Sequence, residues 1–239
     1  MGSAVVRFEI GGADDQLLAG FYGELFGWQL TPVPGANYTL IAAAGGGVSG
    51  GLGRSRTGEP WATFYAETAD VQAVLDRAAA LGGKTVVPVT VIPGQLAYAM
   101  LADPDGLLVG VASLAPAQGR LAGPGAPVDW FEVLGSEAEV TRRFYTSLFG
   151  WTAAAGPGGY ARVATGAGHG IQGGLGAAAG ARWATVYASV PDVAEALAEV
   201  EELGGSREYG PLPAGDHTQA GAFRDPAGNV FGVYQHAAH

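Results

Sequence analysis

Two stretches of the chain decide its fold. Residues 7–28 read RFEIGGADDQLLAGFYGELFGW, and residues 130–151 read WFEVLGSEAEVTRRFYTSLFGW. Their shared residues, among them F-E near the start and FY-x-x-LFGW at the end, recur at an offset of 123. Further matches follow in the same order at an offset of 122: WAT at 61–63 and 183–185, LGG at 81–83 and 203–205, and DP-x-G at 103–106 and 225–228. A repeat whose order is preserved predicts two copies of one domain.

The segment between the copies has the composition of a linker. Residues 116–127 read PAQGRLAGPGAP, which is rich in Pro, Gly and Ala and has no apolar period. We therefore expect one domain over residues 1–115, a linker over 116–127 and a second domain over 128–236.

Each copy contains the same local signals twice. In the first copy, Leu17, Phe21 and Leu25 have helical spacing, Gly27 is placed to end that helix, and Asp70 is a predicted N-cap of a second helix. Strands are predicted over residues 5–10, 38–42, 48–52, 62–67, 85–91, 97–101 and 107–112. The pattern predicts a strand–helix–strand–strand–strand module, used twice per domain and four times in the chain.

Composition excludes several functions. The net charge is −10, and Lys84 is the only lysine, so the chain lacks the basic surface that nucleic acids or anionic membranes require. The absence of cysteine removes disulfides and thiolate chemistry. We see neither a signal peptide nor an apolar stretch long enough to span a membrane, and we expect a cytoplasmic protein.

At this point the sequence resembles a known superfamily. The run FYGELFGW after a strand, and the closing DPDG and DPAGN turns, are similar to those of vicinal oxygen chelate proteins, the glyoxalase, bleomycin-resistance and dioxygenase superfamily. Tandem two-domain bacterial glyoxalase-like proteins are the nearest subgroup. The resemblance covers nearly the whole chain apart from the linker. It implies an α+β fold of two tandem glyoxalase-like domains, each of two βαβββ modules that form a curled, cup-like mixed sheet around a small molecule.

The resemblance also implies where a metal would bind, and this chain departs from the pattern there. Many relatives use His, Glu or Gln on the first strand of each module and on the last strand. Here those positions hold Arg7 and Trp130, Thr63 and Thr185, and Gly110 and Gly232, and the remaining position falls near Gly51 and Gly174. A guanidinium does not ligate metals, and glycine has no side chain. We therefore expect no metal and no cofactor.

Strand alternation identifies the side chains that would face a ligand. Arg7 and Glu9 share one face of the first strand, and Trp130 and Glu132 share the matching face in the second copy. Thr63 with Tyr65, and Thr185 with Tyr187, are expected on the same faces. Glu9 and Glu132 are candidate catalytic acids or bases, because burial raises a carboxyl pKa into a useful range. Alternatively, each is a structural hydrogen-bond acceptor, which is the interpretation we favour because both copies keep it.

Three further positions have open interpretations. Arg7 would orient a ligand carboxylate or enolate, or it is a surface arginine or a partner of Glu9. Trp130 replaces a polar position and would form a wall against an apolar or aromatic ligand. His217, in the loop PAGDHTQ, would act as an acid or base over the second cup, although an exposed loop histidine is the commoner case.

Two functions are compatible with these features. One is a metal-independent enzyme that acts on an oxygenated, aromatic or polyketide-like molecule by dehydration, cyclisation, isomerisation or lyase chemistry. The other is a non-catalytic protein that binds a small molecule or antibiotic for resistance or sensing. Ionisable side chains expected in both cups favour the enzyme, but one fold hosts both functions.

The duplication predicts the oligomeric state. Single-domain relatives of this fold commonly pair two chains to complete their sites, whereas this chain supplies both copies itself. We therefore expect a monomer to be the smallest competent unit. Sedimentation velocity at several protein concentrations should give one species of the monomer mass, 24.1 kDa. An obligate dimer would contradict the prediction.

Overall fold

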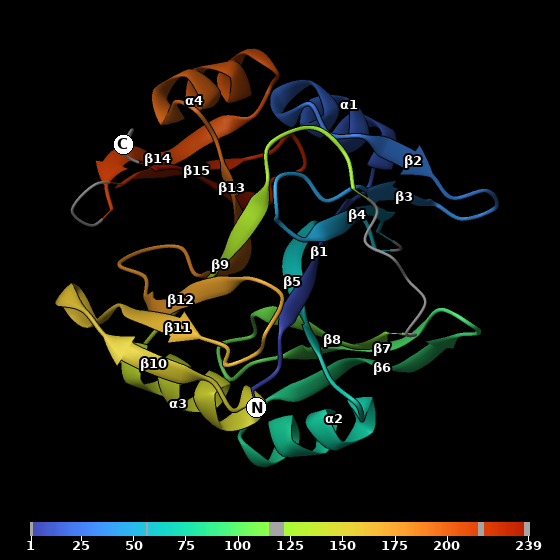
Figure 1. The fold of residues 1–239 in the computed structure, drawn as a ribbon, viewed down its shortest axis with the longest axis vertical. Helices are drawn as coiled ribbons and strands as arrows, with labels where there is room; N and C mark the ends of the chain where they lie inside the picture. Colours follow the sequence, from blue (N-terminus) through green and yellow to red (C-terminus); the bar gives the residue numbers. More distant parts are fainter. Residues whose placement is uncertain (1, 56, 115–121, 215–217, 237–239) are drawn as a thin grey trace. The chain divides into compact units, whose positions relative to one another are not determined.

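The computed structural model describes residues 2–55, 57–114, 122–214 and 218–236. In these ranges the chain forms two eight-stranded sheets and four α-helices (Figure 1). Parallel and antiparallel pairs occur in both sheets, as in the parallel pair β5–β8 and the antiparallel pair β7–β8. The predicted α+β fold class is therefore confirmed.

The first sheet is built from the first half of the chain. Its strand order is β2-β3-β4-β1-β5-β8-β7-β6. The elements are β1 (Val5–Gly12), α1 (Asp15–Phe26), β2 (Leu30–Pro32), β3 (Tyr38–Ile41), β4 (Ser49–Arg54), β5 (Trp61–Glu67), α2 (Val71–Ala80), β6 (Lys84–Ile92), β7 (Leu96–Ala102) and β8 (Leu108–Leu114).

The second sheet repeats this order with the second half of the chain. Its strand order is β10-β11-β12-β9-β13-β16-β15-β14. The elements are β9 (Val128–Gly135), α3 (Ala138–Phe149), β10 (Thr152–Ala155), the short 3-10 helix η1 (Pro157–Gly159), β11 (Ala161–Ala164), β12 (Gln172–Ala177), β13 (Trp183–Ser189), α4 (Val193–Glu202), β14 (Ser206–Pro213), β15 (Thr218–Arg224) and β16 (Val230–His236).

The helix signals in the sequence act as expected, with one difference. Gly27 ends α1 in the left-handed conformation, at φ 63°, and the Asp70 side chain accepts a hydrogen bond from the Ala73 N–H at the start of α2. Leu17, however, is 50% exposed, so the buried stripe of α1 runs through its neighbour Leu18 instead. The sequence did not locate β2, because this strand has three residues and ends in proline.

By its contacts the chain divides into two compact units, each of which takes one module from each half. The α2–α3 unit comprises Met1–Arg7, Thr63–Gly119 and Trp130–Ala184. The α1–α4 unit comprises Phe8–Ala62, Arg120–Asp129 and Thr185–His239. Within each unit the two helices that name it pack against each other (Figure 1). The sequence-based domain boundaries at 115–116 and 127–128 stay a prediction, since residues 115–121 lie outside the described part of the chain.

Both units have aromatic cores built from the repeated FY-x-x-LFGW motif. In the α1–α4 unit the ring of Tyr22 stacks on Trp28, with centroids 5.6 Å apart, and in the α2–α3 unit Tyr145 stacks on Trp151 at 6.2 Å. Both indole nitrogens donate to a backbone carbonyl at 2.7 Å, Trp28 to Ala126 and Trp151 to Ser3. These two tryptophans are therefore part of the core.

The FY motif of one half meets the DP-x-G motif of the other half. In the α1–α4 unit the Tyr22 hydroxyl donates to Asp225 Oδ2 at 3.0 Å. Asp225 Oδ1 accepts the backbone N–H groups of Ala227 and Asn229, each at 2.9 Å, and so closes its own turn. The side-chain amide of Asn229 adds a fourth donor, at 2.8 Å from Asp225 Oδ2.

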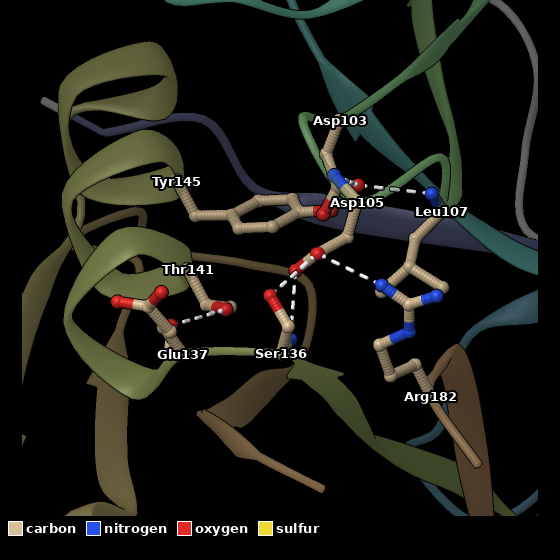
Figure 2. Close-up of polar contacts among 8 residues, drawn as sticks. All are labelled: Asp103, Asp105, Leu107, Ser136, Glu137, Thr141, Tyr145 and Arg182. Atoms are coloured by element: carbon tan, nitrogen blue, oxygen red, sulfur yellow. Dashed lines mark hydrogen bonds and ion pairs between the residues drawn. The ribbon is translucent and has the colours of Figure 1, made fainter.

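The α2–α3 unit contains the equivalent pair. The Tyr145 hydroxyl donates to Asp103 Oδ2 at 3.1 Å, and Asp103 Oδ1 accepts the N–H groups of Asp105 and Leu107 (Figure 2). Burial raises the pKa of both Asp103 and Asp225, and hydrogen bonds offset part of that rise. The pKa of each tyrosine is also raised, chiefly by burial and then by the charge of its aspartate.

No helix in the described part of the chain is long and apolar enough to cross a membrane.

Removing either tyrosine hydroxyl should destabilise the protein. A buried acceptor that loses its donor costs about 1–3 kcal/mol. Tyr145→Phe should cost more than Tyr22→Phe, because the Asn229 amide still donates to the carboxylate oxygen that Tyr22 leaves. Urea-unfolding midpoints should fall in that order. Tyr98→Phe is the control, since the Tyr98 hydroxyl has no hydrogen bond within the described residues, and a midpoint lowered equally by all three changes would contradict the assignment.

Candidate functional site

The second copy places a glutamate and a tryptophan on the same face of β9. Phe131 and Val133 of this strand are fully buried, and strand alternation directs Trp130 and Glu132 to the opposite face. Across the sheet, Glu132 is paired with Gly174 on β12, and Gly174 is paired with Arg162 on β11. Cross-strand partners share a face, so the Glu132 carboxylate and the Arg162 guanidinium lie on one surface.

Glu132 is buried and hydrogen-bonded. It is 8% exposed, and its Oε2 accepts a hydrogen bond from Trp183 Nε1 at 3.0 Å. A hydrogen bond donated to a carboxyl oxygen fixes the direction in which the group points. Glu132 is therefore oriented by Trp183. This contact is the kind expected if Glu132 is a structural hydrogen-bond acceptor.

Two more side chains complete this surface. The guanidinium of Arg162 lies over the Trp130 ring, 5.2 Å from the centroid, and Arg162 itself is exposed. Tyr160 covers Gly174 so closely that a Cβ on that glycine would lie 1.8 Å from the tyrosine oxygen. We call Trp130, Glu132, Tyr160, Arg162 and Trp183 the β9 face. All five belong to the α2–α3 unit.

The first copy has the same residues in a different arrangement. Glu9 and Trp61, the counterparts of Glu132 and Trp183, both lie against Gly53 in the α1–α4 unit: a Cβ there would be 3.4 Å from Glu9 Oε1 and 3.3 Å from the Trp61 ring. Trp61 Nε1 is buried and has no hydrogen-bond partner within the described residues. Arg7, on the same strand as Glu9, is half-buried.

The threonines predicted to bind substrate are engaged in the sheets. Thr63 and Thr185 are fully buried. Each hydroxyl donates to a backbone carbonyl at 2.7 Å, that of Leu108 and that of Val230 respectively. Their donor capacity is therefore already used.

The tyrosines predicted to bind substrate are buried over glycines. Tyr65 covers Gly110 on β8, and Tyr187 covers Gly232 on β16. The Tyr187 hydroxyl lies 3.0 Å from the hydroxyl of Tyr209, so this tyrosine has a polar neighbour in the α1–α4 unit.

The predicted histidine, His217, lies outside the described residues. The described His169 contacts Glu67 at 2.5 Å, and both side chains are partly exposed.

Comparison with known proteins supports the fold alone. No family model matches the chain, and no curated protein does either. Solved structures do match. A Mn(II)-bound glyoxalase from Novosphingobium aromaticivorans is similar at a TM-score of 0.64 and 20% identity, over 98% of this chain and 83% of that one. Homoprotocatechuate 2,3-dioxygenase from Arthrobacter globiformis is similar at a TM-score of 0.70 and 16% identity, over 98% and 80%. The 2,3-dioxygenase LapB from Pseudomonas sp. KL28 is similar at 0.66 and 14%, over 100% and 94%.

The chain therefore shares the fold of these glyoxalase and dioxygenase structures. At these identities the likeness says nothing of substrate or metal in this chain. The match covers nearly all of it, as the repeated motifs predicted.

The positions at which the sequence resemblance places metal ligands do not fit a metal in this chain. At the last-strand positions a Cβ on Gly110 would lie 2.3 Å from the Tyr65 ring, and one on Gly232 would lie 2.1 Å from the Tyr187 ring, so no ligand side chain has room. At another position Thr63 already donates within the sheet. In the described part of the chain, no three His, Asp or Glu side chains come together in a way that would hold a metal ion.

Sequence reasoning missed two members of the β9 face, Tyr160 and Arg162. The sequence does contain a signal for Tyr160, because Tyr38 occupies the equivalent position in the first copy, at the offset of 122. Arg162 has no such signal, since its counterpart is Leu40. Only the strand register brings Arg162 beside Trp130.

Elemental analysis of protein purified without chelator should give well under one equivalent of Zn, Fe, Ni or Mn per chain. The physical reason is that the ligand positions hold an arginine, hydrogen-bonded threonines and glycines covered by tyrosine rings. Protein incubated with Mn(II) and then desalted is the second measurement and should also be metal-poor. Stoichiometric metal, with activity lost on chelation, would mean that the ligand positions are assigned wrongly.

Proposed function

We propose that the protein is an enzyme that binds a small oxygenated molecule, aromatic or polyketide-like, against the β9 face and acts on it by acid–base chemistry without a metal. The observation that carries this proposal is Glu132, a buried and oriented carboxylate on the same surface as the exposed guanidinium of Arg162. The first copy, with Arg7, Glu9, Thr63 and Tyr65, and the Thr185–Tyr187 segment remain candidate ligand contacts.

The composition of the β9 face supports the ligand class. Trp130, Tyr160 and Trp183 offer ring surfaces suited to a flat apolar body. Arg162 offers a planar cation that matches a carboxylate, phenolate or enolate oxygen. A ligand that is both flat and oxygenated would use both features.

The proposed role of Glu132 is to accept and return a proton. The hydrogen bond from Trp183 to Oε2 holds the carboxyl group of Glu132 in place, and the carboxylate form would abstract the proton. Arg162 would hold the negative charge that develops on a ligand oxygen as the proton leaves. Dehydration, cyclisation, isomerisation and lyase reactions each have a base-catalysed form that begins with such a transfer.

A second candidate, a non-catalytic binding protein for resistance or sensing, is favoured by one observation. Several polar groups at the predicted sites have structural partners: Glu132 accepts from Trp183, and the hydroxyls of Thr63 and Thr185 donate to backbone. In that case the charged groups would only orient the ligand.

The test begins with native mass spectrometry of freshly purified protein, to identify a co-purifying molecule that serves as ligand. Glu132→Gln keeps the shape of the side chain and removes its titrating group. An enzyme should then lose turnover by ~10²–10⁴-fold, the usual contribution of a general base. The matched comparison is Glu9→Gln, which makes the same change in the first copy. It should mainly alter stability, and a loss of turnover in this variant instead would move the catalytic site to the first copy.

The alternative has its own outcome. If the protein only binds, Glu132→Gln should leave ligand affinity within roughly tenfold, about 1.4 kcal/mol, with no turnover in either form. Full turnover by both variants on the identified substrate would end the enzyme proposal.

A further inference from the structure

The two copies differ in what their equivalent tryptophans bind. In the α2–α3 unit, Trp183 Nε1 donates to Glu132 at 3.0 Å. In the α1–α4 unit, the equivalent Trp61 Nε1 has no partner within the described residues. A buried indole N–H without an acceptor costs free energy, so the copies are not energetically equivalent at this point. The contacts around Trp183 therefore differ from those around Trp61 in a way that favours the hydrogen bond to Glu132.

Asp105, in the DPDG turn, makes the contacts that distinguish the two copies. Its Oδ2 accepts the Ser136 N–H at 2.8 Å, and its Oδ1 accepts the Ser136 hydroxyl at 2.7 Å (Figure 2). The same Oδ1 accepts Arg182 Nη1 at 3.0 Å. Burial alone would raise the pKa of Asp105, but the hydrogen bonds from Ser136 and the charge of Arg182 outweigh it and lower the pKa. The side chain is therefore a carboxylate with three donors.

These contacts tie together the two strands that carry the Trp183–Glu132 hydrogen bond. Ser136 directly follows β9, which carries Glu132, and Arg182 directly precedes Trp183, the first residue of β13. The two strands are neighbours in the second sheet. A carboxylate that holds the end of one strand and the start of the next limits how far Trp183 shifts relative to Glu132.

The α1–α4 unit lacks every member of this arrangement. Asp105 is replaced by Ala227, Ser136 by Ala13 and Arg182 by Pro60. Ala227 nevertheless occupies the equivalent place: a Cβ on Gly12 would lie 3.0 Å from the Ala227 methyl, as one on Gly135 would lie 2.5 Å from Asp105 Oδ2. The same site in the fold thus holds a carboxylate in the α2–α3 unit and a methyl group in the α1–α4 unit.

A second difference acts in the same direction. The ring of Trp61 lies flat on Gly11, where a Cβ would be 2.2 Å from it. The equivalent residue in the second copy is Leu134, whose side chain takes that space beside Gly176. Trp183 is therefore excluded from the position that Trp61 adopts.

We propose that Asp105 is a positioning residue which, through Ser136 and Arg182, holds Trp183 against Glu132 and makes the second copy the working site. This inference rests on the proposed function for its consequence, namely that Glu132 is the working carboxylate. The geometry it asserts is testable without any ligand.

The experiment follows the indole N–H resonances of the five tryptophans by proton–nitrogen NMR, assigned by single Trp→Phe changes. In the wild-type protein the Trp183 resonance should move with pH as Glu132 titrates, and Glu132→Gln should abolish that movement. In Asp105→Ala, which copies the residue of the other half, the Trp183 resonance should shift upfield, lose most of its pH response and exchange faster with deuterium. Trp28 and Trp151, bonded to backbone carbonyls, are internal controls that should not change.

A second variant, Arg182→Ala, distinguishes a local effect on Trp183 from a general loss of folding in Asp105→Ala. The Arg182 side chain is 46% exposed, and the change removes its ion pair while Ser136 keeps its bonds to Asp105. It should produce a smaller shift in the same direction. A Trp183 resonance that titrates as in the wild type in both variants would overturn the positioning role. Unchanged turnover in Glu132→Gln would instead refute the proposed function and leave the NMR result standing.

Discussion

The hydrogen bond between a buried tyrosine hydroxyl and a buried aspartate carboxylate joins the two motifs that recur in this chain. Tyr22 reaches Asp225, and Tyr145 reaches Asp103, so each FY motif is completed by the DP-x-G turn of the other half. The aspartate also accepts the N–H groups of its own turn, which leaves it little freedom to move. Each compact unit therefore depends on residues from both halves of the chain, and neither half forms its tyrosine–aspartate hydrogen bond without the other.

Once the two copies complete each other's cores, their ligand-facing surfaces are free to diverge. The cation of the first copy lies on the first strand, at Arg7, whereas the second copy has Trp130 there and its cation at Arg162. The DPDG turn carries Asp105 where the DPAG turn carries Ala227, and this one side chain adds three hydrogen bonds beside the β9 face. In the proposal above, a change in a turn that supports the core acts on the half-buried Trp183 through Ser136 and Arg182.

The last-strand positions at which the sequence resemblance places metal ligands are covered by tyrosine rings in both copies. Tyr65 and Tyr187 each cover a glycine on the last strand of their module, at distances that leave no room for a ligand side chain. Aromatic packing has replaced donor groups at equivalent places in both copies. The chemistry proposed above therefore depends on an oriented carboxylate and a guanidinium, groups that act through protons and charge.

The sequence by itself determined the repeat, the modules and the caps, because helix periodicity, strand alternation and glycine or aspartate at helix ends are local properties. It also identified Glu132 and Trp130 as sharing a face, since alternation within one strand needs no tertiary information. Only the tertiary structure decided that each FY tyrosine pairs with the aspartate of the opposite half, because either aspartate satisfies the same local pattern. It likewise decided that Arg162 stacks on Trp130 and that Asp105 holds Ser136 and Arg182, since strand register and contacts between distant turns are set by packing, to which sequence spacing gives no guide.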